Sequence, residues 1–365
     1  MKRSIRFFIT SLGSGGAERV LVNLLAWLDP EKYKVSLMTV YGGTNEKNLP
    51  PYVEYKRIIK GRGKLSKLIK KILLKLPPRL FASLFLKGVF DFEVAYLEGV
   101  PTAFLLAKRT SGRKIAFVHC DLSVNKTGYP LYSNAKKCLK AYSRFDRVCF
   151  VSEDARRGFE SAIGHLDNAA VVHNVIDVKS ILSLAEQPAD REYDDASLKL
   201  ITVGRLAPEK NFSMLLSVVS ELSIEYSIEL WIVGDGELRG ELSEIKESKN
   251  LDNVHFLGYS DNPYPYIKKA DMFVCSSLFE GYSTAVLESV VLSTPVITTD
   301  CAGMSEILGD GRFGMIVENS KEGLKKGIIK IINDPEILNK YRSELKKFSP
   351  DELPFNKDYN ELFDY

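Results

Sequence analysis

Two carboxylates stand eight residues apart in the stretch LFEGYSTAVLES, residues 278–289. Glu280 lies in a small polar turn after the predicted strand DMFVCSS, and Glu288 lies in an apolar run that predicts a helix ending before Pro295. A carboxylate at the end of a strand can accept hydrogen bonds from sugar hydroxyls, and Glu288 can reach a second polyol such as a ribose. The backbone N–H groups at the start of the helix favour a phosphate, and they belong to Gly281, Tyr282, Ser283 and Thr284. An exposed acidic loop with a surface glutamate is the alternative, weakened because the rest of the helix is almost wholly apolar and a buried charge needs a partner.

A second turn between a strand and a helix supplies positive charge. In LITVGRLAPEKNFSMLL the predicted strand ends at Gly204 and a helix begins near Asn211, so Arg205 and Lys210 project from the same turn. A guanidinium, an ammonium and a helix amino end together suit a diphosphate, because all three favour anionic oxygens. A solvated turn in which Lys210 pairs with Glu209 fits the same residues, and both interpretations stay open.

Glycine loops follow two further predicted strands. Gly234 and Gly236 in LWIVGDGELRGEL let the backbone approach a ligand, but a tight connection without a ligand needs the same residues and is the favoured interpretation. Gly13, Gly15 and Gly16 in FITSLGSGGAERV join the first strand to a helix as in a dinucleotide site. Such a site has an acidic residue at the end of the second strand, whereas here that strand ends LMTVYGG. A nicotinamide dehydrogenase is therefore disfavoured, although these glycines still allow a ligand close to the backbone.

His119 ends the predicted strand KIAFVHCDLS and is one of four histidines. At the carboxyl end of a parallel strand it would face the crevice where ligands bind, as a hydrogen-bond donor or as an acid/base. A structural histidine bonded to the local backbone is the alternative. Asp121 and Ser123 are expected to cap the following segment.

A cationic segment, YKRIIKGRGKLSKLIKKILLKLPPR over residues 55–79, contains ten Lys and Arg and no acidic residue. Apolar residues recur at spacings of three, four and seven, which predicts a helix with one apolar and one cationic face. Such a helix suits an anionic membrane surface or an anionic lipid-linked acceptor. A helix packed on its own domain would have the same apolar stripe, whereas nucleic acid is disfavoured because no aromatic residues alternate with the cations. The cations assigned to this surface are Lys64, Lys67, Lys70, Lys71 and Lys75.

These motifs follow strands, which indicates the architecture that must position them. Predicted strands alternate with amphipathic helices, as in parallel sheets covered on both faces. In the first half the strands are IRFFIT, KVSLMTV, FEVAYL, KIAFVH, RVCFVS and AAVVHN, and in the second half LKLITVG, IELWIVG, NVHFLG, DMFVCSS and PVITTD. The 365 residues exceed the size of a single core, and the polar segment 176–197 is the predicted linker. The predicted fold class is α/β, with two doubly wound, Rossmann-like domains facing each other across a ligand-binding cleft.

The composition is that of an ordinary globular protein, with 45% hydrophobic and 27% charged residues. Its charge is uneven, because residues 1–180 contain 31 Lys and Arg against 15 Asp and Glu, and residues 181–365 contain 19 against 32. Five scattered cysteines with no C-x-x-C pair indicate reduced thiols in the cytosol. The apolar part of the amino-terminal stretch is short and interrupted by Arg6, which indicates a buried strand and not a signal peptide. No apolar run approaches the roughly 18 residues of a membrane span.

In order and spacing, the motifs SGGAERV, VGRLAPEKN, VGDGELR, FLGYSDN and EGYSTAVLE resemble those of the retaining family-4 glycosyltransferases, which have the GT-B fold. The resemblance covers almost the whole chain, more strongly in the second half. It implies that residues 1–178, joined by 349–365, bind the acceptor, and that residues 179–348 bind a nucleotide sugar, for which a UDP-sugar is expected.

The resemblance also implies roles for individual residues. Arg205 and Lys210 would bind the diphosphate and stabilise the departing nucleoside diphosphate. Glu280 would contact the donor sugar, His119 the transferred sugar and Glu288 the ribose. Gly15 and Gly16 would line the phosphates, and the backbone near residues 257–259 would hold the base. The full donor-binding set is Gly15, Gly16, Arg205, Lys210, Gly234, Leu257, Gly258, Gly281, Tyr282, Ser283, Thr284 and Glu288.

We therefore expect a retaining hexosyltransferase that needs no cofactor and no metal, because two cations and a helix amino end supply the charge that a divalent ion provides elsewhere. No D-x-D triplet occurs, in agreement with this expectation. Because the second acid is assigned to the ribose, front-side transfer is expected in place of a two-carboxylate covalent mechanism. The expected partners are a nucleotide sugar, a lipid-linked glycan and the inner face of the cell membrane, in bacterial polysaccharide or lipopolysaccharide assembly. A UDP-sugar 2-epimerase-like isomerase and a non-catalytic partner subunit stay open as alternatives.

Overall fold

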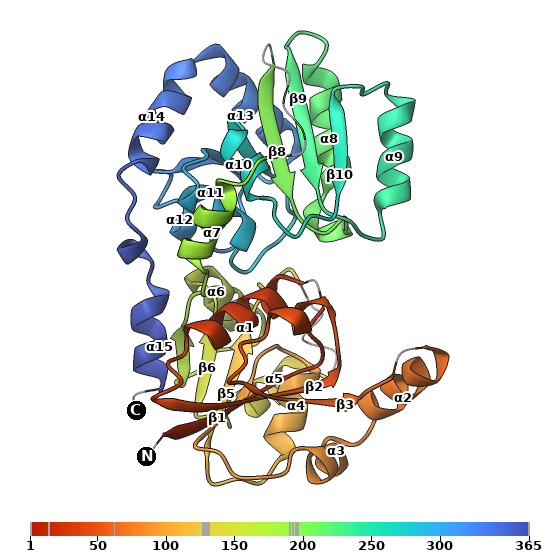
Figure 1. The fold of residues 1–365 in the computed structure, drawn as a ribbon, viewed down its shortest axis with the longest axis vertical. Helices are drawn as coiled ribbons and strands as arrows, with labels where there is room; N and C mark the ends of the chain where they lie inside the picture. The colour runs from red at the N-terminus through yellow and green to blue at the C-terminus, as the bar shows by residue number, and fades with distance from the viewer. Residues whose placement is uncertain are drawn as a thin grey trace. The chain divides into compact units, whose positions relative to one another are not determined.

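The computed structural model describes residues 2–13, 15–61, 63–125, 132–189, 191, 193 and 197–363. The chain forms two α/β units (Figure 1). Unit 1 comprises Met1–Ile176 together with Pro354–Tyr365, and unit 2 comprises Asp177–Leu353. The sequence had placed the boundary at residues 178/179 and the return of the chain at residue 349.

Unit 1 is built on a parallel sheet in the order β3-β2-β1-β4-β5-β6-β7. Its strands are β1 (Arg3–Ile9), β2 (Tyr33–Tyr41), β3 (Glu54–Ile59), β4 (Phe92–Ala95), β5 (Arg113–Val118), β6 (Arg147–Phe150) and β7 (Ala169–Val171). Its helices are α1 (Gly16–Trp27), η1 (Thr44–Asn48), α2 (Lys64–Leu74), α3 (Pro78–Phe85), α4 (Val100–Ala107), α5 (Ala135–Tyr142), α6 (Glu153–Ala162) and α15 (Phe355–Phe363). The central strands are apolar and buried, as expected for strands covered by helices on both faces.

Unit 2 repeats this plan with a sheet in the order β10-β9-β8-β11-β12-β13, again parallel throughout. Its strands are β8 (Leu198–Val203), β9 (Ile228–Val233), β10 (Val254–Gly258), β11 (Met272–Cys275), β12 (Val296–Thr299) and β13 (Gly314–Val317). Its helices are α7 (Val178–Ala185), η3 (Pro208–Lys210), α8 (Phe212–Leu222), α9 (Arg239–Ser248), α10 (Tyr264–Lys269), α11 (Thr284–Val291), α12 (Met304–Ile307), α13 (Lys321–Asn333), α14 (Pro335–Leu345) and η4 (Pro350–Glu352). Both doubly wound sheets confirm the predicted fold class.

Two strands that the sequence did not predict, β3 and β13, lie at the edges of the two sheets. Strand β3 has the sequence EYKRII with alternating burial, and β13 is the four-residue segment GMIV. An edge strand is covered less than a central one and tolerates charge, so β3 lacks an apolar run, whereas β13 is apolar but too short to stand out.

A buried charge cluster fixes strand β4 of unit 1 to its neighbours. The carboxylate of Glu93 is fully buried and forms ion pairs with both Arg6 of β1 and Lys108, which follows α4. Arg6 also donates a 2.5 Å hydrogen bond to the carbonyl of Lys87. Because buried charges need partners, these residues tie β1, β4 and the segment after α3 to one another.

The carboxyl-terminal helix α15 packs on the sheet of unit 1 (Figure 1). Phe363 makes edge-on ring contacts with Phe7 and Phe92, and Tyr359 stacks at 6.2 Å from Phe117. Asp358 accepts hydrogen bonds from the backbone N–H of His173 at 2.9 Å and contacts its ring at 2.7 Å. No helix in the described part of the chain is both long and apolar enough to cross a membrane.

Candidate functional site

Lys210 and Glu280 lie at the point of the unit-2 sheet where the strand order reverses. Strands β8 and β11 are neighbours there, and in parallel sheets the loops that follow such strands form ligand crevices. Lys210 follows β8 and Glu280 follows β11, and Lys210 Nζ lies 2.5 Å from Glu280 Oε1. The two side chains are 22% and 13% exposed. The fold thus joins two predicted site residues that stand 70 positions apart in the sequence.

The electrostatics of this pair keep the lysine charged. Burial acts to lower the pKa of Lys210, but the charges and hydrogen bonds around it, chiefly those of Glu280, together outweigh burial and raise the pKa. Ser277 Oγ donates a 2.7 Å hydrogen bond to the same carboxylate oxygen, Glu280 Oε1. The ammonium has three N–H donors, so the pair leaves it donors for a further anionic ligand.

Arg205 projects from the same turn as Lys210 and pairs with Glu209 at 2.6 Å. Burial of Glu209 opposes its ionisation, but the hydrogen bond from Arg205, a backbone hydrogen bond and the charges of Arg205 and Lys210 together lower the pKa of Glu209. The sequence alternative, in which Lys210 pairs with Glu209, is therefore not the ion pair that forms. The Arg205 side chain is 55% exposed, and such surface pairs contribute only about 0–1 kcal/mol, so Arg205 can turn to another anion at small cost.

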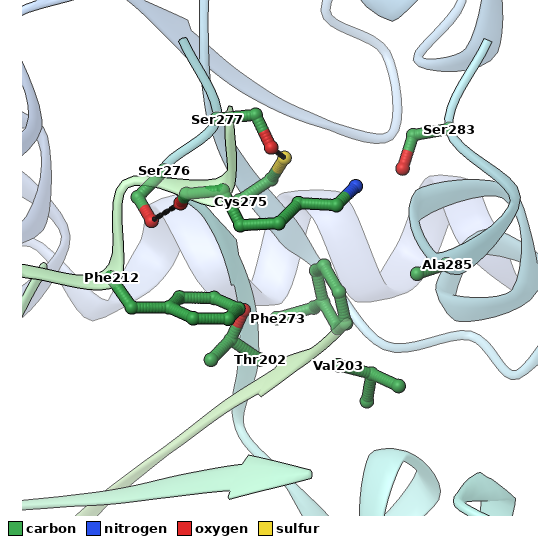
Figure 2. Close-up of a pocket in the computed structure, with 10 residues that line it drawn as sticks. Thr202, Val203, Phe212, Phe273, Cys275, Ser276, Ser277, Ser283 and Ala285 are labelled. Atoms are coloured by element: carbon green, nitrogen blue, oxygen red, sulfur yellow. Dashed lines mark hydrogen bonds between the residues drawn. The ribbon is translucent and has the colours of Figure 1, made fainter. Parts of the chain in front are cut away.

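A cavity of about 10 Å³, which is room for about one water molecule, is lined in part by Lys210 (Figure 2). Ser276, Ser277 and Ser283 line its polar part, and Phe212 and Phe273 its apolar part (Figure 2). The hydroxyl of Ser276 donates to the backbone carbonyl of Lys210 at 2.8 Å, which fixes the end of that turn. The other lining residues are Thr202, Val203, Lys210, Cys275 and Ala285.

The amino end of helix α11 borders the same cavity. Ser283 is its N-cap residue and makes no capping hydrogen bond with its side chain. Glu288 lies further along α11, is 3% exposed and accepts a 3.3 Å hydrogen bond from the hydroxyl of Tyr264. Glu288 is therefore a buried carboxylate with a protein partner, as the apolar surroundings in the sequence required.

The Gly234 loop is explained by packing within unit 2. Gly234 has a φ of 144°, and a Cβ there would lie 1.9 Å from the carbonyl oxygen of Gly204. A Cβ at Gly236 would lie 2.4 Å from the carbonyl oxygen of Leu206. The favoured sequence interpretation, a tight connection, accounts for both glycines.

The backbone expected to hold the base lies next to this loop. Gly258 has a φ of 75°, faces open space on its side-chain side and accepts the N–H of Gly234 at 2.7 Å. Leu257 is partly buried and Tyr259 is exposed. The loop after β10 is thus attached to the loop after β9 and has room beside it.

In unit 1, His119 follows β5 and lies against the aromatic rings of Tyr96 and Phe117. Its Nε2 is buried without a hydrogen-bond partner, and burial lowers the pKa of its ring to about 3. The imidazole is therefore neutral at physiological pH, which favours a hydrogen-bonding role over that of a charged acid. The backbone N–H of His119 donates to Glu98 Oε2 at 2.9 Å, and the thiol of Cys120 approaches Glu98 Oε1 at 3.2 Å.

Asp121 caps the turn after His119, as the sequence predicted. It accepts hydrogen bonds from the backbone N–H and the hydroxyl of Ser123 at 2.8 Å and 2.6 Å. Sequence reasoning did not identify Glu98, although it too follows a strand, β4, and precedes a helix. The position of Glu98 after a strand was the only signal in the sequence, and no motif of characteristic spacing distinguished it from the other acidic residues.

The glycine loop after β1 is braced by the loop after β2. Asn45 donates from its backbone to the carbonyl of Leu12 at 3.0 Å, and its side chain bonds the carbonyl of Gly13. Gly15 is the N-cap of α1, and a Cβ there would lie 2.3 Å from a carboxylate oxygen of Glu18. Gly16 has open space where a side chain would be.

Residues 55–59 of the cationic segment lie in β3, and its periodic apolar residues form the predicted helix, α2, whose apolar stripe is exposed. Helix α2 has no fully buried residue, and it projects from the edge of the sheet in Figure 1. The apolar residues exposed on α2 and α3 are Leu65, Leu68, Ile69, Ile72, Leu80 and Leu84. Lys64, Lys67, Lys71 and Lys75 are exposed, whereas the ammonium of Lys70 lies 3.6 Å from the ring centre of Tyr41. The alternative of a stripe packed on its own domain is therefore wrong for the stripe on α2.

Two family models match the chain, "Glycosyltransferase Family 4" over residues 14–180 and "Glycosyl transferases group 1" over residues 185–348. Together they span both units, and the chain belongs to this family of glycosyltransferases with the GT-B fold.

Among curated relatives, two enzymes of Campylobacter jejuni resemble the chain along 94% of both sequences. The first, 27% identical, is N-acetylgalactosamine-N,N'-diacetylbacillosaminyl-diphospho-undecaprenol 4-alpha-N-acetylgalactosaminyltransferase. The second, 26% identical, is the alpha-1,4-N-acetyl-D-galactosaminyltransferase that acts on GalNAc-alpha-(1->4)-GalNAc-alpha-(1->3)-diNAcBac-PP-undecaprenol.

Solved structures show the same fold at lower sequence identity. HepE of Anabaena, crystallised with UDP and glucose, has a TM-score of 0.73 at 17% identity and covers 99% of this chain and 98% of its own. TarM of S. aureus, crystallised with UDP among other ligands, has a TM-score of 0.74 at 12% identity with full coverage of both chains.

Proposed function

We propose that this glycosyltransferase transfers a sugar, with retention, from a UDP-sugar to a lipid-linked glycan at the inner face of the cell membrane. The observation that carries the proposal is the 2.5 Å pair of Lys210 and Glu280 beside Arg205, at the point where ligands bind in doubly wound sheets. A cation for a diphosphate and a carboxylate for a sugar stand there side by side. The names of the two Campylobacter relatives support an acceptor linked to undecaprenyl diphosphate.

In this proposal the departing UDP is stabilised by fixed positive charge and by backbone dipoles, without a metal. Lys210 and Arg205 follow β8, and the amino end of α11 borders the same cavity as Lys210. Cations and N–H groups held in place before the reaction stabilise developing charge on the leaving oxygens without further reorganisation. The raised pKa of Lys210 favours this role, because the ammonium keeps its charge.

Retention is proposed to occur by front-side attack. A covalent route needs a second carboxylate as nucleophile near the reacting carbon. Glu288 is 3% exposed and bonded to Tyr264, so its placement does not favour that role. Both Campylobacter relatives are named for alpha products, and an alpha product from an alpha-linked donor is retention by definition.

The remaining donor and acceptor contacts are proposed for the loop after β10, for two loops of unit 1 and for helix α2. The open backbone at Gly258 and Leu257 would hold the base, and Gly15, Gly16 and the neutral His119 of unit 1 would meet the phosphates and the transferred sugar. The exposed apolar stripe of α2, flanked by Lys64, Lys67, Lys71 and Lys75, would lie in an anionic membrane interface.

The test is a transfer assay with variants of the ion pair. UDP, UDP-glucose, UDP-galactose, UDP-N-acetylglucosamine and UDP-N-acetylgalactosamine are first screened for thermal stabilisation and then assayed with undecaprenyl-diphosphate-linked glycans. Lys210→Ala and Glu280→Ala should lower turnover at least a hundredfold. Lys268→Ala, which breaks an exposed 2.5 Å pair with Glu186 in the same unit, should leave turnover unchanged.

Four outcomes would contradict the proposal. Transfer that persists in Lys210→Ala would refute the site. Transfer that is lost on chelation and returns only with a divalent ion would refute leaving-group stabilisation by Lys210, Arg205 and the amino end of α11. Interconversion of free UDP-sugars without any acceptor would identify the epimerase-like alternative. A non-catalytic subunit would bind no UDP-sugar and gain no turnover with any acceptor.

A further inference from the structure

We propose that Ser277 is a positioning residue for Glu280. Its hydroxyl holds one oxygen of the carboxylate, so that the other oxygen faces the sugar of the bound donor. The inference rests on the proposed function and adds to it a residue that the family motifs in the sequence did not bring forward. It is carried by the distribution of hydrogen bonds around the Glu280 carboxylate.

The two oxygens of Glu280 have unequal surroundings. Oε1 accepts from Lys210 Nζ at 2.5 Å and from Ser277 Oγ at 2.7 Å. Oε2 accepts no hydrogen bond from the described residues. A carboxylate has lone pairs for about four hydrogen bonds, so Oε2 keeps its full capacity for ligand hydroxyls. The protein therefore orients this carboxylate by one oxygen only.

The direction of the Ser277 hydroxyl proton follows from its other neighbour. The thiol of Cys275 approaches Ser277 Oγ at 3.4 Å. Burial, and secondly the charge of Glu280, raise the pKa of Cys275, so the thiol keeps its proton and can donate it. With a donor on one side and an ionised carboxylate on the other, Ser277 directs its own proton to Glu280. Hydrogen bonds in such a chain strengthen one another.

The backbone of Ser277 is held by three side chains from neighbouring loops. Its carbonyl accepts from the hydroxyl of Thr299 at 2.7 Å, from the thiol of Cys301 at 3.0 Å and from the amide of Asn319 at 3.3 Å. Thr299 is fully buried, and Ser277 is 1% exposed. The hydroxyl of Ser277 is therefore a fixed reference point and not a mobile surface group.

Removing this hydroxyl should affect the sugar and spare the nucleotide. In Ser277→Ala the carboxylate keeps only Lys210 as its partner on Oε1, so it can turn and present Oε2 in other directions. UDP lacks the sugar that Oε2 would contact, and Lys210 and Arg205 are unchanged. A structural defect of the whole loop would instead weaken UDP and UDP-sugar binding together.

The experiment compares Ser277→Ala, Ser277→Thr and Ser289→Ala. The threonine keeps the hydroxyl, and Ser289 is an equally buried serine whose hydroxyl donates to the carbonyl of Ala285 within α11. We expect Ser277→Ala to lower kcat with UDP-N-acetylgalactosamine ten- to a hundredfold, with the Kd for UDP within twofold of wild type by calorimetry. Ser277→Thr should restore most of the loss, and Ser289→Ala should match wild type.

A double-mutant cycle tests whether Ser277 acts through Glu280. Ser277→Ala should weaken binding of UDP-N-acetylgalactosamine in the wild-type background and have no further effect in Glu280→Gln. A kcat of Ser277→Ala within twofold of wild type, equal losses for UDP and the UDP-sugar, or additive losses in the cycle would each overturn the inference.

Failure of the proposed function would be distinguishable. A wild-type protein that binds neither UDP nor UDP-N-acetylgalactosamine contradicts that function. In that case a crystal structure of Ser277→Ala still decides the inference, because an unmoved Glu280 carboxylate would overturn it and a turned one would support it.

Discussion

Replacing Leu68 and Ile72 by serine should release the protein from anionic vesicles without unfolding it. Both side chains lie on the apolar stripe of α2 and are 55% and 54% exposed, so they contribute little to the packing of unit 1. The same surface would be covered when α2 lies in a membrane interface.

The expected loss is worked from these exposed fractions. Full burial of a Leu or Ile side chain contributes about 1.5–3 kcal/mol. Slightly more than half of the surface of each side chain is exposed and would be buried by the membrane. The two together are equivalent to about one fully buried side chain, so their burial would contribute about 2 kcal/mol to membrane binding. That energy corresponds to a decrease of about 30-fold in the partition coefficient.

The assay is co-sedimentation with vesicles of phosphatidylglycerol and phosphatidylcholine, accompanied by a melting curve. Ile224→Ser is the matched control, because Ile224 follows α8 in unit 2 and is 82% exposed outside the stripe. It should bind vesicles as wild type does. If Leu68→Ser/Ile72→Ser bound within threefold of wild type at an unchanged melting temperature, α2 would not be the membrane surface.

The lysines of α2 give an independent check on the same surface. Lys71 is exposed, and a cation near an anionic surface contributes about 1 kcal/mol, so Lys71→Ala should lower vesicle binding about fivefold. Lys70 lies over the ring of Tyr41, so Lys70→Ala should lower vesicle binding less and cost about 0.5–1 kcal/mol of folding stability. Equal effects of the two substitutions on binding would contradict this division of roles.

Three further predictions concern unit 1. Glu93→Gln should lower the unfolding free energy by about 3–5 kcal/mol in urea titrations, because it leaves two buried cations without a charge partner, whereas Glu54→Gln, which breaks an exposed pair, should change it by less than about 1 kcal/mol. Because the pKa of His119 is lowered to about 3, the unfolded state binds more protons than the folded state between pH 6.5 and pH 3. The free energy of unfolding should therefore decrease as the pH is lowered from 6.5 towards 3, by up to about 1.4 kcal/mol per pH unit. His119→Gln should flatten this dependence in urea titrations at several pH values. Asp358→Asn weakens the contact with His173, so amide hydrogen exchange in α15 should become faster than in wild type.

Most of the fold could be predicted from the sequence because its central strands are buried on both faces. Runs such as FEVA and IELWIV are apolar except for one glutamate each, and this pattern can be recognised without knowing which strands pair. The edge strand β3 escaped prediction because three of the first four residues of EYKRII are charged, and β13 escaped it because GMIV is only four residues long. The amphipathic helix of the cationic segment was predicted from its apolar periodicity and forms as α2, whereas the first residues of the segment lie in the unpredicted strand β3.

The candidate site was predictable as a set of loops but not as a set of contacts. The sequence placed Arg205, Lys210 and Glu280 after strands, and the structure brings all three to the carboxyl ends of the neighbouring strands β8 and β11. Which acid pairs with which cation depends on the order of β8 and β11 in the sheet, and no local pattern encodes that order. Ser277 was missed because a serine at the end of a predicted strand is common, and only its bond to Glu280 distinguishes it.

The pairing that the sequence could not reveal explains how one lysine can serve two anions. Arg205 and Lys210 are each matched by a carboxylate, so the turn carries little net charge, which avoids uncompensated positive charge at the partly buried Lys210. In the proposed reaction the exposed pair of Arg205 opens at small cost to meet the diphosphate, whereas Lys210 keeps its bond to Glu280 and offers its other N–H groups. The ammonium would then stand between the sugar-binding carboxylate and the leaving phosphate and fix the distance between them. Because Glu280 also raises the pKa of Lys210, the ammonium that would stabilise the leaving group keeps its charge at physiological pH.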